Sequence, residues 1–340
     1  MSFGQLPQIA GILYGIKPAV VAIVVFAAHR IGSRALRNAV LWAIAACAFI
    51  AVAVFNVPFP YIVLAAGLSG LVGSRLAPEK FTMKNANHAA GKSSGKAVID
   101  DDTPTPAHAR FRVRRFAALI IIGLSLWAAV LGLLTVLYGW HAVLTQMGWF
   151  FTKAALLTFG GAYAVLPYVY QGAVQMHGWL TPIQMIDGLA LGETTPGPLI
   201  MIVAFVGFVG GWTHSLFGPD SQLLAGAVAA SVATFFTFLP SFLFIFIGGP
   251  LVESTQDNLK FTAPLAGITA GVVGVILNLA VFFAYHVIWP HGLQADIDWL
   301  SVLAVVVALV ALFRFKVGVI RLIFAFGMAG LAHHMLLQGL

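Results

Sequence analysis

The chain consists of apolar runs separated by short polar stretches. Many of these runs are about 20 residues long, which is the length a helix needs to cross the hydrocarbon core of a bilayer. The pattern predicts about ten membrane-spanning or half-spanning helices, over residues 8–29, 38–55, 58–74, 116–139, 149–175, 183–212, 222–250, 261–288, 299–313 and 317–336. We therefore expect an all-α integral membrane protein.

Composition agrees with this interpretation. Of the 340 residues, 60% are hydrophobic and only 9% are charged, and a soluble domain of this size cannot cover so much apolar surface. The single cysteine, Cys47, cannot form an intrachain disulfide. The start, MSFGQLPQIAG, has no basic region, so we expect no cleavable signal peptide.

The basic residues predict how the chain is oriented. Nine of the 18 lysines and arginines fall between Arg75 and Arg115, in a polar stretch rich in Gly, Ser and Pro. Since basic loops face the cytoplasm, we interpret 76–115 as a polar cytoplasmic linker, with no indication of nucleic-acid binding. The loop with Arg30, Arg34 and Arg37 is expected on the same side, and the acidic loop 290–298 outside.

An internal repeat links the two ends of the chain. Residues 10–28 align with 266–284, and residues 57–71 align with 317–331. The alignment pairs glycines throughout, at Gly11/Gly267, Gly15/Gly271, Gly67/Gly327 and Gly70/Gly330. The loops that follow the two copies are predicted on opposite sides of the membrane, so the copies run in opposite directions. Inverted homologous units of this kind are typical of secondary transporters.

The repeat predicts three parts: a partial first repeat of three helices (1–75), the linker (76–115), and a complete second repeat (116–340). The first, incomplete unit has no counterpart of residues 116–265. We expect either an N-terminally shortened transporter, or a homo-oligomer or partner half-transporter that supplies the missing part.

Two breaks interrupt the apolar runs of the second unit, at Gly160-Gly161 and at Thr195-Pro196-Gly197-Pro198. Threonine followed by proline is typical of a helix start, so we expect half-helices over 162–174 and from Pro196 to about Val209. Exposed N–H groups at such starts bind anions, and irregular backbone at membrane depth is tolerated where it lines a cavity. The alternative is that the glycines and prolines only permit close packing or a kink.

Three charged residues are candidates for function. Glu193 lies beside the second break, and an acid in an apolar setting can take up and release a proton, so proton coupling is one role. The alternative is an interfacial acid, or one paired with Lys153. Lys17 and Lys153 could balance an oxyanion, or could extend to the headgroups instead. We expect Asp187 at the interface and Asn278 in a hydrogen bond between helices.

Other chemistry finds little support. The ten histidines show no metal-ligand spacing, and there is no Walker loop, GxSxG elbow or dinucleotide fingerprint. We therefore predict no metal, no cofactor and no enzymatic activity. A membrane-embedded enzyme that uses Glu193 or the histidines is the less favoured alternative.

Several stretches resemble the chromate ion transporter family. They are FGGAYAVLPYV (159–169), GWLTPIQMIDGLALGETTPGPLIMIVAFVGF (178–208), TFLPSFLFIFIGGPLVE (237–253) and AGITAGVVGVILNLAVFFA (266–284). ILYGIKPAVVAIV (12–24) and VPFPYIVLAAGLSG (57–70) resemble the later part of the family's first half. The family is described as two homologous halves that move chromate, and related oxyanions such as sulfate, across the bacterial inner membrane.

The resemblance implies an inner-membrane oxyanion transporter, with chromate efflux driven by the proton gradient or the membrane potential. Phe159-Gly160-Gly161 corresponds to the family's FGG motif and Pro196-Gly197-Pro198 to its PGP motif. The implied substrate-binding residues are Gly160, Gly161, Thr194, Thr195, Pro196, Gly197 and Pro198, with charge from Lys153 or Lys17 and proton coupling by Glu193. The first half's own FGG and PGP would precede Met1, so a non-transporting or truncated subunit that needs a partner half is the alternative.

Overall fold

The fold is all-helical in the residues that the structure, a computed structural model, describes. These are residues 7–76, 113–158, 162–194, 199–254, 262–290, 292 and 296–338. Within them all regular structure is helical, and six helices are long and apolar enough to cross a membrane. The predicted all-α membrane fold is therefore confirmed. The predicted linker lies almost wholly outside the described residues.

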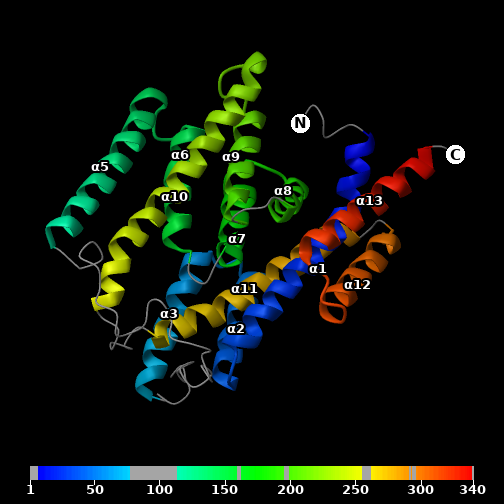
Figure 1. Ribbon diagram of the computed structural model, residues 1–340, viewed down its shortest axis with the longest axis horizontal. Coiled ribbons are helices and arrows are strands. Elements are labelled where there is room, and N and C mark those ends of the chain that lie inside the picture. The colour runs from blue at the N-terminus through cyan, green and yellow to red at the C-terminus, as the bar shows by residue number, and fades with distance from the viewer. Residues whose placement is uncertain are drawn as a thin grey trace, which may run out of the picture.

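The helices form two groups with two connecting helices between them (Figure 1). One group, which we call the six-helix module, contains α1 (Pro7–Ala35), α2 (Ala39–Ala53), α3 (Phe59–Leu76), α11 (Thr262–Ile288), α12 (Trp299–Phe313) and α13 (Val319–Gln338). The other group, the lobe, contains α5 (Val113–Tyr138), α6 (Val143–Leu156), α9 (Ile202–Thr213) and α10 (Gln222–Ser254). The connecting helices are α7 (Ala162–Tyr170), which continues as a π-helix over Gln171–Met176, and α8 (Pro182–Thr194). Short 3₁₀ turns precede α9 (Leu199–Met201) and α10 (Pro219–Ser221).

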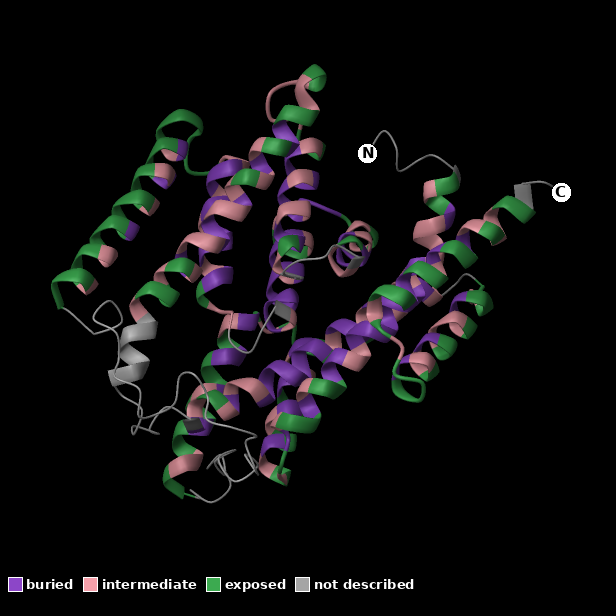
Figure 2. Ribbon diagram, viewed as in Figure 1, coloured by how far each residue is buried: buried purple, intermediate pink, exposed green. Residues whose placement is uncertain are grey.

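Many of the buried residues lie where α1 crosses α11. Both helices are buried along their middle parts, as Figure 2 shows, whereas α5 and α12 carry exposed apolar side chains. Ile121 and Val136 on α5 are 63% and 84% exposed. Apolar surface of this kind suits a lipid environment, because hydrocarbon tails accept it at no cost. Most buried residues of the module and the lobe join in one large core, and a smaller second cluster lies where the end of α1 meets α2 and α11.

The six-helix module is built from two similar arms. α1 packs on α12 and α13, α11 packs on α2 and α3, and α1 and α11 pack on each other. A Cβ on Gly15 would meet the Phe326 carbonyl oxygen and, at 2.8 Å, the Gly330 Cα. The matching position in the other arm is Gly267, where a Cβ would meet the Ala66 carbonyl oxygen and, at 3.0 Å, the Gly70 Cα. Small residues thus let both pairs of backbones approach closely.

This packing corrects one register of the predicted repeat. Gly15 takes the structural place of Gly267, whereas the sequence alignment paired Gly15 with Gly271 and Gly11 with Gly267. The difference is one helical turn. Glycines four residues apart lie on the same helix face, so the sequence pattern alone did not distinguish the two registers.

The segments α2–α3 and α12–α13 keep the predicted register. Asn38 and Asp298 cap α2 and α12 with their side chains. Asn56 and Lys316 have positive φ angles of 50° and 52° in the two following turns. In the same turns the Val57 N–H donates to the Ala51 carbonyl at 3.0 Å, and the Val317 N–H donates to the Ala311 carbonyl at 3.1 Å. These pairs have the same spacing along the chain as the predicted alignment; their inverted orientation in a membrane stays a prediction.

Asp298 also joins α12 to α1. Its Oδ2 accepts from the Tyr14 hydroxyl at 2.7 Å and from the Ser301 hydroxyl at 2.8 Å. Partial burial alone would raise the pKa of the Asp298 carboxyl, but the hydrogen bonds from Tyr14 and Ser301 outweigh it and hold the pKa below its usual range. The carboxylate is therefore charged at neutral pH and holds the two helices together.

Candidate functional site

Helices begin directly after both predicted breaks. α7 starts at Ala162, as expected from Gly160-Gly161, and the 3₁₀ turn that leads into α9 starts at Leu199, after Pro198. The predicted site residues Gly160, Gly161, Thr195, Pro196, Gly197 and Pro198 lie outside the described residues, and so does the side chain of Thr194. The structure therefore defines the flanks of both breaks.

The two flanks touch each other. The Tyr163 hydroxyl donates a hydrogen bond to Oε1 of Glu193. Tyr163 lies two residues after Gly161, and Glu193 lies two residues before Thr195. The contact thus brings the start of α7 and the end of α8 together beside both breaks. Sequence analysis selected Glu193 but missed Tyr163, although its place in FGGAY put it within one helical turn of the motif.

The expected alternative for Glu193, a pair with Lys153, is wrong. Both side chains are described, and the recorded partner of Glu193 is Tyr163. The Lys153 ammonium instead lies 5.6 Å from the centroid of the Trp149 ring, one turn earlier on α6. This cation–π contact stabilises the charge within the lobe.

Lys17 has a carboxylate partner. Its Nζ lies 3.5 Å from Oδ1 of Asp187, and the two side chains are 25% and 17% exposed. Asp187 lies largely buried where α8 packs on α1 of the six-helix module, and its expected place at the membrane interface stays a prediction. The pair is long for a hydrogen bond, and Asp187 Oδ1 has no hydrogen-bond partner among the described atoms. Since the carboxylate neutralises Lys17, this lysine can offer its full charge to an anion only when the pair opens.

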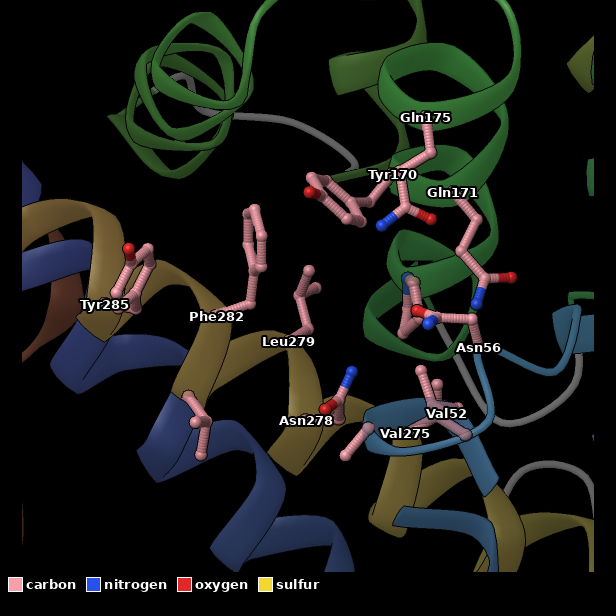
Figure 3. Close-up of a pocket in the computed structure, with 13 residues that line it drawn as sticks. Val52, Asn56, Tyr170, Gln171, Gln175, Val275, Asn278, Leu279, Phe282 and Tyr285 are labelled. Atoms are coloured by element: carbon pink, nitrogen blue, oxygen red, sulfur yellow. The ribbon is translucent and has the colours of Figure 1, made fainter. Parts of the chain in front are cut away.

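A neutral hollow of about 340 Å³ lies between α2, α11 and the α7/π-helix segment. Figure 3 shows the amides of Asn56, Gln175 and Asn278 directed toward the same space, which Gln171 also lines, and no charged residue lines it. Asn278 was expected to bond a neighbouring helix; its amide faces this hollow instead.

The π-helix shapes this hollow and ties it to the module. Gln171 Oε1 accepts from the Phe59 N–H at 2.8 Å, and its Nε2 donates to the Val57 carbonyl at 3.4 Å. The wider turn places Gln171 and Gln175 beside one cavity, and π-helical turns of this kind occur often at functional sites.

Comparison with known proteins identifies the family. Residues 1–71 and 145–331 match the family model described as Chromate transporter. The chain belongs to the chromate transporter family. This agrees with the resemblance inferred from the FGG and PGP motifs. With six apolar helices, this family member is a multi-pass bacterial membrane protein.

Three relatives define the extent of the likeness. A chromate transport protein of Pseudomonas aeruginosa is 34% identical over 319 residues, which cover 93% of this chain and 65% of the relative. One from Cupriavidus metallidurans is 27% identical over 315 residues, or 92% and 64%. The uncharacterized transporter YwrA of Bacillus subtilis is 28% identical over 178 residues, or 52% of this chain and 88% of the relative. No solved structure matches.

The chain thus spans about 65% of the length of the first two relatives. The family match includes Lys17, Tyr163, Asp187 and Glu193, and it leaves out the predicted linker together with α5. The charged contacts around the two breaks therefore lie within the family's common core.

Proposed function

We propose that this protein moves a tetrahedral oxyanion, chromate or sulfate, across the bacterial inner membrane. The Tyr163–Glu193 contact carries the proposal, because it joins the flanks of the two motifs, and the 3₁₀ turn that leads into α9 contacts both α7 and α8. The direction we propose is export, and the driving force is the proton gradient or the membrane potential.

The chemistry follows from the helix starts. The positive end of a helix dipole and its unpaired N–H groups favour an anion without requiring a fixed counter-charge. We propose that the dianion lies between the starts of α7 and of the 3₁₀/α9 segment. The residues proposed to contact it are Gly160, Gly161, Thr194, Thr195, Pro196, Gly197 and Pro198.

The charge that completes this site comes from a lysine. Lys17 lies on the module and its partner Asp187 lies on the connecting helix α8, so the pair couples the two parts. An arriving dianion competes with Asp187 for Lys17, and the opened pair frees α8 to shift against α1. Such rocking of one unit against another is the usual basis of alternating access. Lys153, held over Trp149, is proposed as an additional positive charge for the site.

Assembly is a separate proposal. Within the described residues, each module helix has a counterpart in the other arm, whereas the α5–α10 segment has none. We propose that a second copy, or a partner half-transporter, supplies the corresponding segment. Chemical cross-linking of the full chain in the membrane, followed by mass analysis, tests this: monomers alone would contradict a homo-oligomer.

Glu193 is proposed to carry the coupled proton. Glu193→Gln keeps an acceptor for the Tyr163 hydroxyl but cannot ionise. We expect the pH dependence of oxyanion flux to disappear and the rate to fall about 100-fold, the lower end of the range for loss of a proton-transfer group. Expression should be unchanged.

The matched control is Asp220→Asn, an acid on the exposed 3₁₀ turn before α10, which should transport like the parent chain. The measurement is chromate accumulation in bacteria at several external pH values, against an empty vector. A Glu193→Gln chain that keeps both rate and pH profile would remove Glu193 from coupling. Equal accumulation with parent chain and empty vector would count against export itself.

A further inference from the structure

A second hollow, of about 440 Å³, lies where the end of α1 meets α7, α11 and the start of α13. Its lining includes three arginines, Arg30, Arg34 and Arg37, all of them exposed. Tyr163 and Thr269 also line it, with their hydroxyls donating to Glu193 and to the Leu265 carbonyl, and no carboxylate belongs to the lining. The hollow therefore carries a concentrated positive charge that no lining carboxylate offsets.

The described structure provides no carboxylate that neutralises these arginines. The ion pair recorded among the described residues is Lys17–Asp187, which involves none of them. Arg37 Nε donates to the Arg34 carbonyl oxygen at 3.0 Å, which fixes that guanidinium at the rim and leaves its other donors available.

The close spacing of the arginines needs a reason. Arg30 and Arg34 are one turn apart on α1, where like charges repel each other and destabilise the helix. The negative end of the helix dipole favours basic residues here, but it does not account for their gathering around one cavity. A bound group with two negative charges would relieve the repulsion, and guanidinium forks match the oxygen geometry of such a group.

The hollow also reaches the flank of the motif site. Tyr163 lines it, and the same Tyr163 hydroxyl is bonded to Glu193 beside the two breaks. Arg30 lines the hollow together with Tyr163. An anion held by the arginines would therefore lie next to the residue that follows the FGG motif by two positions.

We infer that this hollow is a capture site for a tetrahedral oxyanion group, on the side of the membrane that the basic residues predict to be cytoplasmic. A dissolved dianion such as sulfate or chromate, and the phosphate of an anionic lipid, share this chemistry. The role of the hollow in capturing a dissolved substrate rests on the proposed function. The existence of an anion-binding site in the hollow does not depend on that function.

Arginine modification tests the site independently of transport. The full chain in neutral detergent is treated with phenylglyoxal, and modification of each arginine is quantified by mass spectrometry. We expect sulfate, compared with chloride at equal ionic strength, to slow modification of Arg30, Arg34 and Arg37 at least fivefold. Arg314 and Arg321, which are exposed nearby but do not line the hollow, are the internal controls and should change less than 1.5-fold. Equal protection of all five, or protection of none by either sulfate or an anionic lipid, would overturn the site.

Two further experiments are needed. The first distinguishes a dissolved anion from a lipid phosphate, and the second tests the binding site separately from the proposed transport function. Phosphatidylglycerol micelles that protect the three arginines, when sulfate does not, would identify a lipid phosphate and overturn the capture role. In inside-out vesicles, R30Q/R34Q/R37Q should raise the half-saturating chromate concentration about tenfold with less than a twofold change in maximal rate.

R314Q/K316Q/R321Q, which removes the same number of charges next to the hollow, should leave both values within twofold. Sulfate protection without any chromate flux would keep the site and reject the proposed function. Flux without protection, or with equal effects of both triple variants, would reject the capture site and keep the function.

Discussion

Asp187→Asn is expected to remove more than nine-tenths of oxyanion flux and to destabilise the chain. The change leaves the Lys17 ammonium without its carboxylate between α1 and α8. Breaking a fully buried pair costs about 3–5 kcal/mol, and the partial exposure of both side chains reduces this to about 1–3 kcal/mol here. Flux falls further because an unopposed Lys17 retains the anion instead of exchanging it with Asp187. Unfolding midpoint and sulfate flux are measured on the same detergent-purified preparations.

The double variant Lys17→Met/Asp187→Leu separates structure from function. Replacing an ion pair by apolar side chains of similar volume is often neutral for stability, so the unfolding midpoint should recover. Flux should not recover, because the exchanging charges are gone. A double variant that regains both properties would mean that the pair is structural. An Asp187→Asn chain with parental flux would contradict the pair's role altogether.

Gly15→Leu is expected to prevent α1 and α13 from packing. A Cβ at this position would collide with the Phe326 carbonyl and the Gly330 Cα. Both are backbone atoms that cannot move aside, so the helices must separate. Overpacking typically costs about 1–3 kcal/mol, and we expect at least the upper value here. The readout is the fraction of monodisperse protein in detergent and its unfolding midpoint.

The chain offers both a repeat partner and a control for this change. Gly267→Leu meets the equivalent atoms in the other arm, at the Ala66 carbonyl and the Gly70 Cα, and should cause a similar loss. Gly132→Leu on the exposed face of α5 meets nothing within 4 Å, and leucine favours the helix, so stability should stay equal or rise. Equal losses of stability for the Gly15 and Gly132 variants would show that close backbone contact between α1 and α13 does not explain the effect at Gly15.

Much of the fold was predictable because lipid imposes a local rule. A segment at membrane depth must satisfy its own backbone hydrogen bonds, so the length of an apolar run sets the length of a helix. The run predicted over 299–313 is α12, with identical bounds. The start of α7 after Gly160-Gly161 was also predictable, since glycine acts on the backbone where it stands. The second start was predicted at Pro196, outside the described residues, and the first described helical residue after it is Leu199.

The pairing of side chains was not predictable in the same way. Helix periodicity gives the face on which a residue lies, but not the helix that the face meets. Lys17 and Asp187 are far apart in the chain, and their contact depends on how α8 packs on α1. For this reason the contact between Lys17 and Asp187 was not predicted, and Tyr163 was missed. The alignment of the repeat was wrong by one helical turn for a related reason. Glycines recur at helical spacing in both arms, so the sequence could not show that Gly15 is equivalent to Gly267.

The most direct test of the central claim is flux through the purified full chain alone. The chain is reconstituted in proteoliposomes, a membrane potential or a pH gradient is imposed, and uptake of radiolabelled chromate is followed. We expect an initial rate at least tenfold above that of protein-free liposomes, saturable and inhibited by sulfate, and lost with Asp187→Asn. A rate equal to that of empty liposomes, with folded protein confirmed in the bilayer, would contradict the proposal that this chain carries oxyanions across the membrane.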